Sequence, residues 1–156
     1  DQLRTKTAHK VRRLLGSMGI EEDVVWIKKF VPYHDVPFWI SAMDICTIPF
    51  NHYHPTAYYS APIRLLEYLA LEKPVLSTPV PEVLTIAKDY VNVVLTAEDY
   101  VREIKSYIKD STKYLDKGKQ GKRVAMQFTW TKITQSYRLF LKEITEKSQS
   151  RGKLIE

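Results

Sequence analysis

Four short apolar runs, each joined to the next by a stretch with helical spacing, constrain the fold of this chain more than any other feature. They are VVWIKKFV (24–31), DICTIPF (44–50), PVLSTP (74–79) and NVVLT (92–96). They are continuous rather than alternating, which is typical of strands buried on both faces. Strands that alternate with helices form parallel sheets with right-handed crossovers. We therefore expect an α/β fold, a Rossmann-like parallel sheet flanked by helices, with ligands at the carboxyl ends of the strands.

The stretches between and after these runs predict the helices. Apolar spacing and cap residues place helices at 3–18, 35–43, 62–71 and 81–88. From residue 97 to about 147 the pattern is helical, with one break expected at 117–121 and another at FTWT, 128–131. We expect a single domain over residues 1–147 and a frayed tail over residues 148–156.

Composition and charge exclude several classes of protein. The 156 residues contain a single cysteine, Cys46, which excludes an internal disulfide framework and a multi-cysteine metal site. Its place in an apolar run indicates a buried structural thiol. No run approaches the roughly 18 apolar residues of a membrane span, and no signal-peptide pattern opens the chain, so we expect a cytoplasmic protein. The net charge of +6 favours anionic partners such as nucleotides, phosphate, nucleic acid or an acidic membrane face.

The predicted helix at 62–71 carries its charges in an unusual order. Arg64 lies in the first turn, where the helix dipole favours anions, and Glu67 follows three residues later. A ligand that has negative charge near the helix start and hydroxyl groups farther along the helix would explain the positions of both Arg64 and Glu67. Free amides at residues 60–63 and Arg64 then hold a diphosphate, and Glu67 accepts hydrogen bonds from a ribose diol. The alternative from spacing alone is a solvated surface ion pair.

The same stretch carries a family resemblance. SAPIRLLEYLALEKPVLST (60–78) resembles the Ser-Pro-x-Lys-Leu-x-Glu-Tyr-Met-Ala-x-Gly-Lys-Pro-Val segment of retaining, two-domain (GT-B) glycosyltransferases of family 4, the glycosyl transferases group 1. The strand–turn–helix–strand at 24–50, the Pro-Glu-Val segment with the following strand, and the Phe-Thr-Trp opening of the last helix look like the same family. Together these pieces cover most of residues 15–142.

The resemblance implies the donor-binding, C-terminal domain of such an enzyme. It places Ser60, Ala61, Pro62 and Ile63 beside the donor diphosphate, Arg64 near the phosphates as the catalytic cation, and Glu67 on the ribose. The turn at Lys29, Phe30 and Val31 lies near the base, and Tyr59 stands where the family has an acidic contact to the donor sugar. The implied chemistry transfers a sugar from a nucleoside-diphosphate sugar with retention, without an obligatory metal, cofactor or protein nucleophile. The full list of residues implied at the donor site is Lys29, Phe30, Val31, Tyr59, Ser60, Ala61, Pro62, Ile63, Arg64 and Glu67.

The chain departs from the family pattern at three positions. Tyr59 replaces a glutamate, and Glu72 and Lys29 replace glycines. If position 72 needs a left-handed backbone, the glutamate there is strained. The family's first strand-helix-strand portion of this half and its acceptor-binding N-terminal domain have no counterpart. We therefore expect a fragment or one part of a split enzyme, inactive alone, with the acceptor domain supplied in cis or in trans.

Other functions remain open at this stage. A non-catalytic nucleotide-binding or interaction module of the same fold is one, and a basic nucleic-acid-binding α/β domain is another, although the basic residues match no recognition motif. His52 and His54 could form part of a metal site, but no nearby acid has ligand spacing. Basic clusters in the first helix and at 113–123 favour peripheral contact with anionic lipid at the inner membrane face, or a solvated surface.

Overall fold

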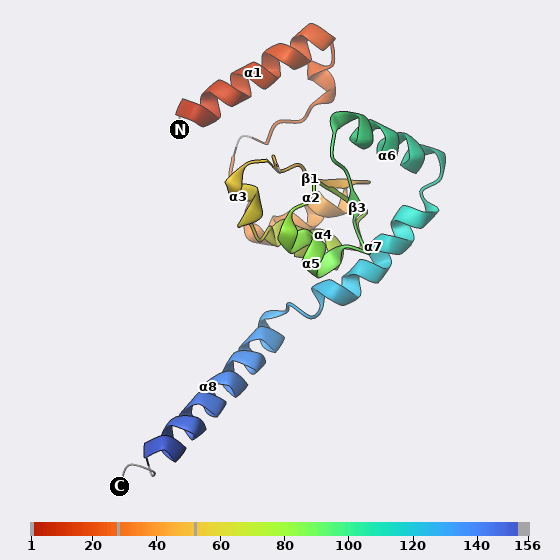
Figure 1. Ribbon diagram of the computed structural model, residues 1–156. Coiled ribbons are helices and arrows are strands. Elements are labelled where there is room, and N and C mark those ends of the chain that lie inside the picture. The colour runs from red at the N-terminus through yellow and green to blue at the C-terminus, as the bar shows by residue number, and fades with distance from the viewer. Residues whose placement is uncertain (1, 28, 52, 153–156) are drawn as a thin grey trace. The chain divides into compact units, whose positions relative to one another are not determined.

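The computed structural model divides the chain into two compact units, residues 1–35 and residues 36–156 (Figure 1). It describes residues 2–27, 29–51 and 53–152. The sequence-based prediction placed residues 1–147 in one domain, whereas the structure places the first 35 residues in a unit of their own. No helix among the described residues is both long enough and apolar enough to cross a membrane.

The first unit contains helix α1 (Gln2–Met18), the 3-10 turn η1 (Glu21–Asp23) and the 3-10 turn η2 (Tyr33–Asp35). Gly19 ends α1 with a φ of 69°, as expected of a left-handed C-cap. The Arg12 guanidinium lies 5.2 Å from the centroid of the Trp26 ring, which ties α1 to the segment after η1.

The prediction of a strand at 24–31 is wrong, because the described residues of that segment form no strand. Residues 24–27 and 29–31 are irregular, and Val25 and Ile27 are exposed. A strand is stable only when its backbone groups pair with a neighbour. The described part of the first unit offers no second strand for that pairing.

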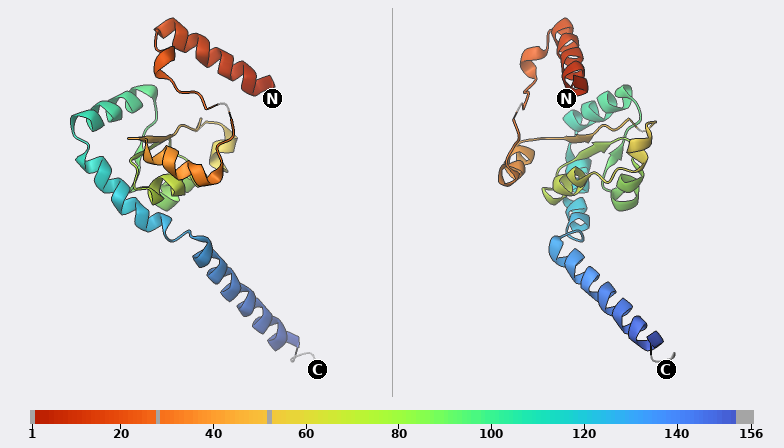
Figure 2. Two further views of the ribbon diagram at one scale, coloured as in Figure 1. Left: turned by 180° about the vertical axis from the view of Figure 1, so that it is seen from behind. Right: turned by 90° about the vertical axis from the view of Figure 1, so that its left-hand side faces the viewer.

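The second unit is built on a parallel three-stranded sheet, which confirms the predicted α/β class. The strands β1 (Cys46–Ile48), β2 (Val75–Ser77) and β3 (Asn92–Val93) follow the order β1-β2-β3. Cys46 pairs with Val75, and Leu76 pairs with Asn92. Both turned views show helices surrounding these strands (Figure 2).

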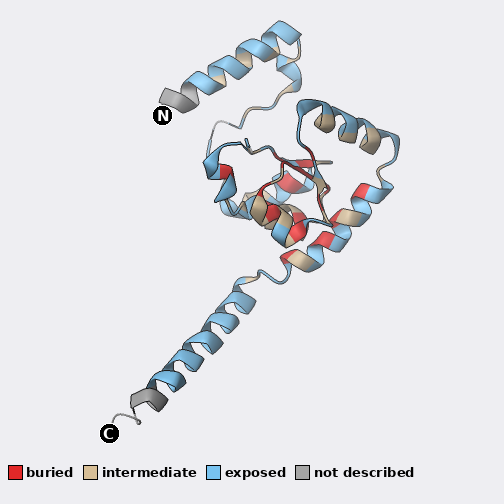
Figure 3. Cartoon of the chain, in the orientation of Figure 1, coloured by how far each residue is buried: buried red, intermediate tan, exposed pale blue. Residues whose placement is uncertain are grey.

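Helices connect and surround the strands. Their bounds are α2 (Val36–Ser41), α3 (Pro55–Tyr58), α4 (Ile63–Ala70), α5 (Pro81–Ala87), α6 (Ala97–Lys109), α7 (Thr112–Ala125) and α8 (Trp130–Gly152). The break at 128–131 is confirmed, because α7 and α8 are separated there. The predicted tail begins inside α8, which continues to Gly152, and residues 153–156 lie outside the described part. Apart from its grey end, α8 is pale blue in Figure 3, because its described side chains are exposed.

The core of the second unit lies between the sheet and α4. Leu65 and Leu69 of α4 are at most 1 % exposed and pack with Val75 of β2. Cys46 belongs to the same cluster, and its burial raises the pKa of its thiol to about 11, as a structural thiol requires. The Tyr114 hydroxyl of α7 donates to the Glu103 carboxylate of α6 over 2.8 Å, which fixes α6 against α7.

Two glycines let α7 pack closely on α4 and the turn after it. A Cβ on Gly118 would lie 2.3 Å from the carbonyl oxygen of Glu72, and a Cβ on Gly121 would lie 2.5 Å from Leu69 Cδ2. The helix break predicted at 117–121 is wrong, because α7 runs without interruption from Thr112 to Ala125. These glycines interrupt the propensity pattern, but the tight contact they permit outweighs the conformational cost of glycine inside a helix.

The turn after α4 has a left-handed residue that is not glycine. Glu72 adopts a φ of 57°, so the strain expected for a glutamate at this position is present. Its carboxylate accepts a hydrogen bond from Lys122 Nζ of α7 over 2.7 Å, and that hydrogen bond is the main cause of its lowered pKa. The turn thus contacts α7 through its carbonyl oxygen at Gly118 and through its side chain at Lys122.

We predict that Gly118→Ala destabilises the second unit by about 1–3 kcal/mol, because the added methyl group meets a backbone carbonyl that cannot move without displacing the turn. Urea unfolding followed by circular dichroism measures the change. Gly121→Ala is expected to cost less, since the nearest atom is a side-chain methyl group.

Gly16→Ala in α1 is the matched control. Its Cβ would lie 3.5 Å from the nearest atom, an ordinary contact, so the gain in helix propensity of up to about 1 kcal/mol should be the main effect. Equal stability of Gly118→Ala and the parent chain would contradict the backbone contact.

Candidate functional site

A cavity opens where β1 ends and α4 begins. Its volume is about 530 Å³. One side is formed by the end of β1 and the residues after it, and the other by the start of α4. The lining residues are Thr47, Ile48, Pro49, Phe50, Ala61, Pro62, Ile63 and Arg64. This is the carboxyl end of a parallel strand, where open α/β sheets bind their ligands.

The start of α4 presents backbone donors at this cavity. Pro62 is the N-cap residue, and no side chain caps the helix there. The first amides of a helix have no partner within it, so the amides of Ile63 and Arg64 remain available, while the Leu65 amide donates to the Pro62 carbonyl. The helix dipole adds positive potential at the same point. The cavity is therefore suited to an anion.

Arg64 and Glu67 do not form the surface ion pair that spacing alone left open. Arg64 is exposed and lines the cavity, whereas Glu67 is partly buried and lies outside the lining set. Among the described residues, no hydrogen bond or ion pair joins either side chain to another group. The guanidinium lies at the cavity, and the partly buried carboxylate follows about one turn further along α4.

Tyr68 reports the local electrostatics of this helix. Burial is the main reason that its pKa is raised, a nearby Arg64 guanidinium lowers it, and the Glu67 carboxylate raises it. The phenol is therefore neutral at physiological pH and packs against the core.

The backbone amides before α4 are not all free, although free amides were expected at residues 60–63. The Ser60 amide donates to the Ala57 carbonyl over 3.3 Å, and its hydroxyl donates to the Thr56 carbonyl over 2.5 Å. Pro62 has no amide hydrogen, so the proposed row of free donors at 60–63 is wrong at both positions. The reason is that the chain makes the short helix α3 here, and its last turn uses the Ser60 donors.

Tyr59 lies at the end of α3 and is 84 % exposed. Its ring meets Tyr58 edge to face, with centroids 5.3 Å apart and an interplanar angle of 78°. Neither ring lines the cavity. The predicted contact of Tyr59 with a donor sugar stays a prediction.

His54 has a structural role that the sequence did not indicate. It is the N-cap residue of α3, and its Nδ1 accepts a hydrogen bond from the Thr56 amide over 3.2 Å. The second histidine of the metal hypothesis, His52, lies outside the described residues. Within the described ranges, no three His, Cys, Asp or Glu side chains are grouped as a metal site requires. The signal for the cap was the proline that follows His54, since proline favours the first turn of a helix.

The base-proximal residues belong to the first unit. Phe30 is 91 % exposed, Lys29 is exposed and Val31 is partly buried. Their role near a nucleotide base stays a prediction. The cavity residues that the sequence reasoning missed are those at the end of β1, namely Thr47, Pro49 and Phe50. Their only signal was the proline that ends the apolar run.

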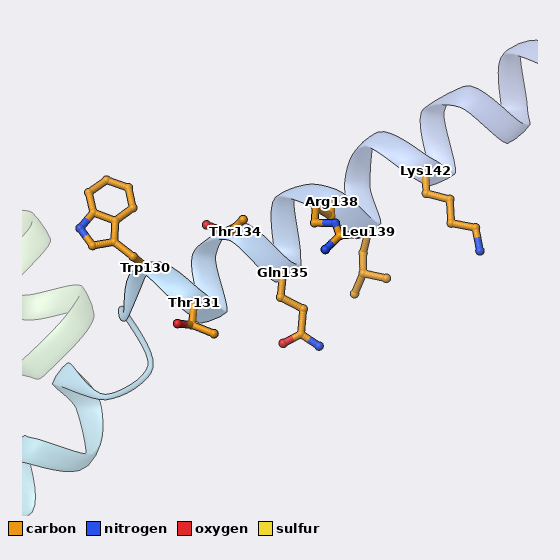
Figure 4. Close-up of a pocket in the computed structure, with 7 residues that line it drawn as sticks. All are labelled: Trp130, Thr131, Thr134, Gln135, Arg138, Leu139 and Lys142. Atoms are coloured by element: carbon orange, nitrogen blue, oxygen red, sulfur yellow. The ribbon is translucent and has the colours of Figure 1, made fainter.

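A larger hollow runs beside α8 but does not form an enclosed site. Its lining comes from one side of a single helix and includes Trp130, Arg138 and Lys142, whose side chains point away from the ribbon (Figure 4). A ligand there would contact only one wall, so few of its groups would be desolvated. The cavity at β1 and α4 has two walls and is the better candidate.

Comparison with known proteins gives one match. The family model described as glycosyl transferases group 1 matches residues 4–111, which include most of α1, the sheet, the cavity and all of α4. No curated protein and no solved structure matches the chain significantly.

Proposed function

Because the chain belongs to the glycosyl transferases group 1 family, we propose that it is the donor-binding part of a retaining glycosyltransferase with a nucleoside-diphosphate sugar as its donor. The observation that supports this most is the two-walled cavity at the end of β1, with the uncapped start of α4 and Arg64 on one wall. An anion of diphosphate size matches that combination of amides, dipole and guanidinium.

In this proposal the diphosphate lies at the start of α4. The Ile63 and Arg64 amides donate to one phosphate, and the Arg64 guanidinium donates to the other. Glu67 accepts hydrogen bonds from the two ribose hydroxyls, which supplies the partner that its carboxylate lacks among the described residues. The sugar ring extends toward Tyr59, as the family resemblance implies, and the role of Lys29, Phe30 and Val31 near the base stays a prediction.

The chemistry follows from where charge develops. The bond between the anomeric carbon and the β-phosphate oxygen breaks, the acceptor oxygen bonds to that carbon on the same face, and the acceptor proton passes to the leaving phosphate oxygen. Negative charge grows on the leaving phosphate in the transition state. In this proposal Arg64 and the helix amides face that charge and stabilise it without reorganising, so no metal is required.

The acceptor is bound elsewhere in this proposal. A second domain, in the same polypeptide or in another chain, supplies the acceptor site, as the resemblance implies. The supporting observation is that the described cavity is formed only by the end of β1 and the start of α4. The α4 wall offers donors for phosphate, and neither wall offers a carboxylate to position an acceptor hydroxyl.

We predict that Arg64→Ala weakens binding of UDP, GDP or ADP by the full chain about 10- to 100-fold, because a charge-assisted contact is worth roughly 1.5–3 kcal/mol. Glu67→Ala should weaken nucleoside diphosphate binding and leave inorganic pyrophosphate binding unchanged, since pyrophosphate has no ribose. Isothermal calorimetry measures both. Arg138→Ala on α8 is the matched control and should bind as the parent chain does.

Other outcomes separate the alternatives. Pyrophosphate binding that is insensitive to Arg64→Ala would refute the placement of the diphosphate. Nucleotide binding without sugar transfer, even with an acceptor domain added, favours a non-catalytic module; the exposed Tyr59 in place of an acidic residue supports that candidate. Affinity for nucleic acid that falls steeply with salt, with no nucleotide binding, favours the basic nucleic-acid-binding domain.

Helix α1 supports a further proposal of peripheral contact with anionic lipid. Lys6, Lys10 and Arg13 share one exposed face, and Leu14 and Met18, which follow Lys10 by one and two turns on the adjoining face, are more than half exposed. Each cation near an anionic surface adds roughly 1 kcal/mol.

We therefore predict that the double variant Lys10→Gln, Arg13→Gln lowers partitioning onto vesicles with 30 mol % phosphatidylserine by about tenfold or more. Co-sedimentation measures it, and salt should weaken the binding of the parent chain. The double variant Lys132→Gln, Lys142→Gln on α8 removes the same charge and is the control. If both double variants lose binding equally, net charge rather than α1 is responsible.

A further inference from the structure

A second, smaller cavity lies beside the start of α4, on another side of the segment that lines the donor cavity. Its volume is about 180 Å³. It is formed by α4, by α5 and by the linker between α7 and α8. The lining residues are Ala61, Pro62, Ile63, Leu65, Leu66, Glu82, Ile86 and Phe128. We call it the rear cavity.

The rear cavity shares a wall with the cavity at the end of β1. Ala61, Pro62 and Ile63 line both. The remaining residues differ, because Thr47 and Phe50 line only the first cavity and Ile86 and Phe128 line only the rear cavity. A ligand in the rear cavity therefore touches the segment that is proposed to hold the donor diphosphate.

The rear cavity has one charged group in an otherwise apolar lining. Glu82 lies in the first turn of α5 and is partly buried. Among the described residues, no hydrogen bond or ion pair reaches its carboxylate. A carboxylate at an apolar wall gains most from a partner that is both positively charged and a hydrogen-bond donor.

The size of the cavity limits the ligand. An engineered apolar cavity of about 150 Å³ in another protein binds benzene, so a volume of 180 Å³ holds one ring or a short branched chain. We propose that the rear cavity binds a small apolar molecule that carries a single ammonium group, with its hydrocarbon part against Leu66, Ile86 and Phe128 and its nitrogen at Glu82.

The two cavities carry opposite charges and therefore favour different ligands. Arg64 and the start of α4 make the first cavity attractive to anions, and Glu82 makes the rear cavity attractive to cations. A nucleoside diphosphate is excluded from the rear cavity by its size and its charge. An ammonium ligand is repelled by Arg64 in the first cavity. The proposal therefore adds a ligand class that the donor site does not accept.

Three probes of similar size and different charge test this proposal. Benzylamine, benzyl alcohol and benzoate are titrated into the isotopically labelled full chain, and amide chemical shifts are followed by NMR. Benzylamine should bind at least tenfold more tightly than benzyl alcohol, and benzoate should not bind. The amides of Ile86 and Phe128 should shift, and those of Thr47 and Phe50 should not. Shifts at Thr47 and Phe50 alone would place the probe in the first cavity and overturn the proposal.

Variants test which group recognises the nitrogen. Glu82→Gln should remove the preference for benzylamine and leave binding of benzyl alcohol unchanged, whereas Glu22→Gln in the first unit is the control and should keep the preference. Ile86→Phe fills the cavity and should abolish binding of benzylamine and benzyl alcohol; Leu66→Phe serves the same purpose if Ile86→Phe does not fold. Benzylamine binding that survives both Glu82→Gln and the filled cavity would refute the site.

Discussion

The close packing of α7 against α4 and the turn that follows it is the constraint on which the second unit depends. Gly118 brings the α7 backbone against the Glu72 carbonyl, and Gly121 brings it against Leu69. These contacts hold the last turn of α4 from outside, while Leu65 and Leu69 fix α4 against the sheet from inside. A helix held on two sides has little freedom to shift, so its other end is fixed as well.

That other end forms the candidate site. With α4 fixed, Ile63 and Arg64 lie beside the residues that follow β1, and the free amides, the helix dipole and the guanidinium meet at one cavity. The same segment separates this cavity from the rear cavity, whose charged group has the opposite sign. The strained Glu72 and the uncapped helix start thus lie at opposite ends of one short helix, the first serving packing and the second left open to a ligand.

The elements that the sequence predicted well are those whose pattern is local. The bounds of α1, α4 and α5 follow from apolar spacing and cap residues, and the Gly19 cap and the left-handed Glu72 follow from the backbone preferences of single positions. The strand at 24–31 was wrong because a strand needs a partner that local sequence does not supply. The break at 117–121 was wrong because glycines that weaken a helix locally also permit a close contact between helices.

The sequence by itself determined the α/β class and the family resemblance. It also singled out Arg64 and Glu67, because their order along the helix does not stabilise that helix. Only the tertiary structure decided that the Ser60 donors are used within α3, that Thr47 and Phe50 form the opposite wall of the cavity, and that Glu82 faces a second one. The physical reason is the distance along the chain over which each kind of interaction acts. Helix spacing and caps act over one or two turns of chain, whereas a cavity exists only where segments distant in sequence leave space between them.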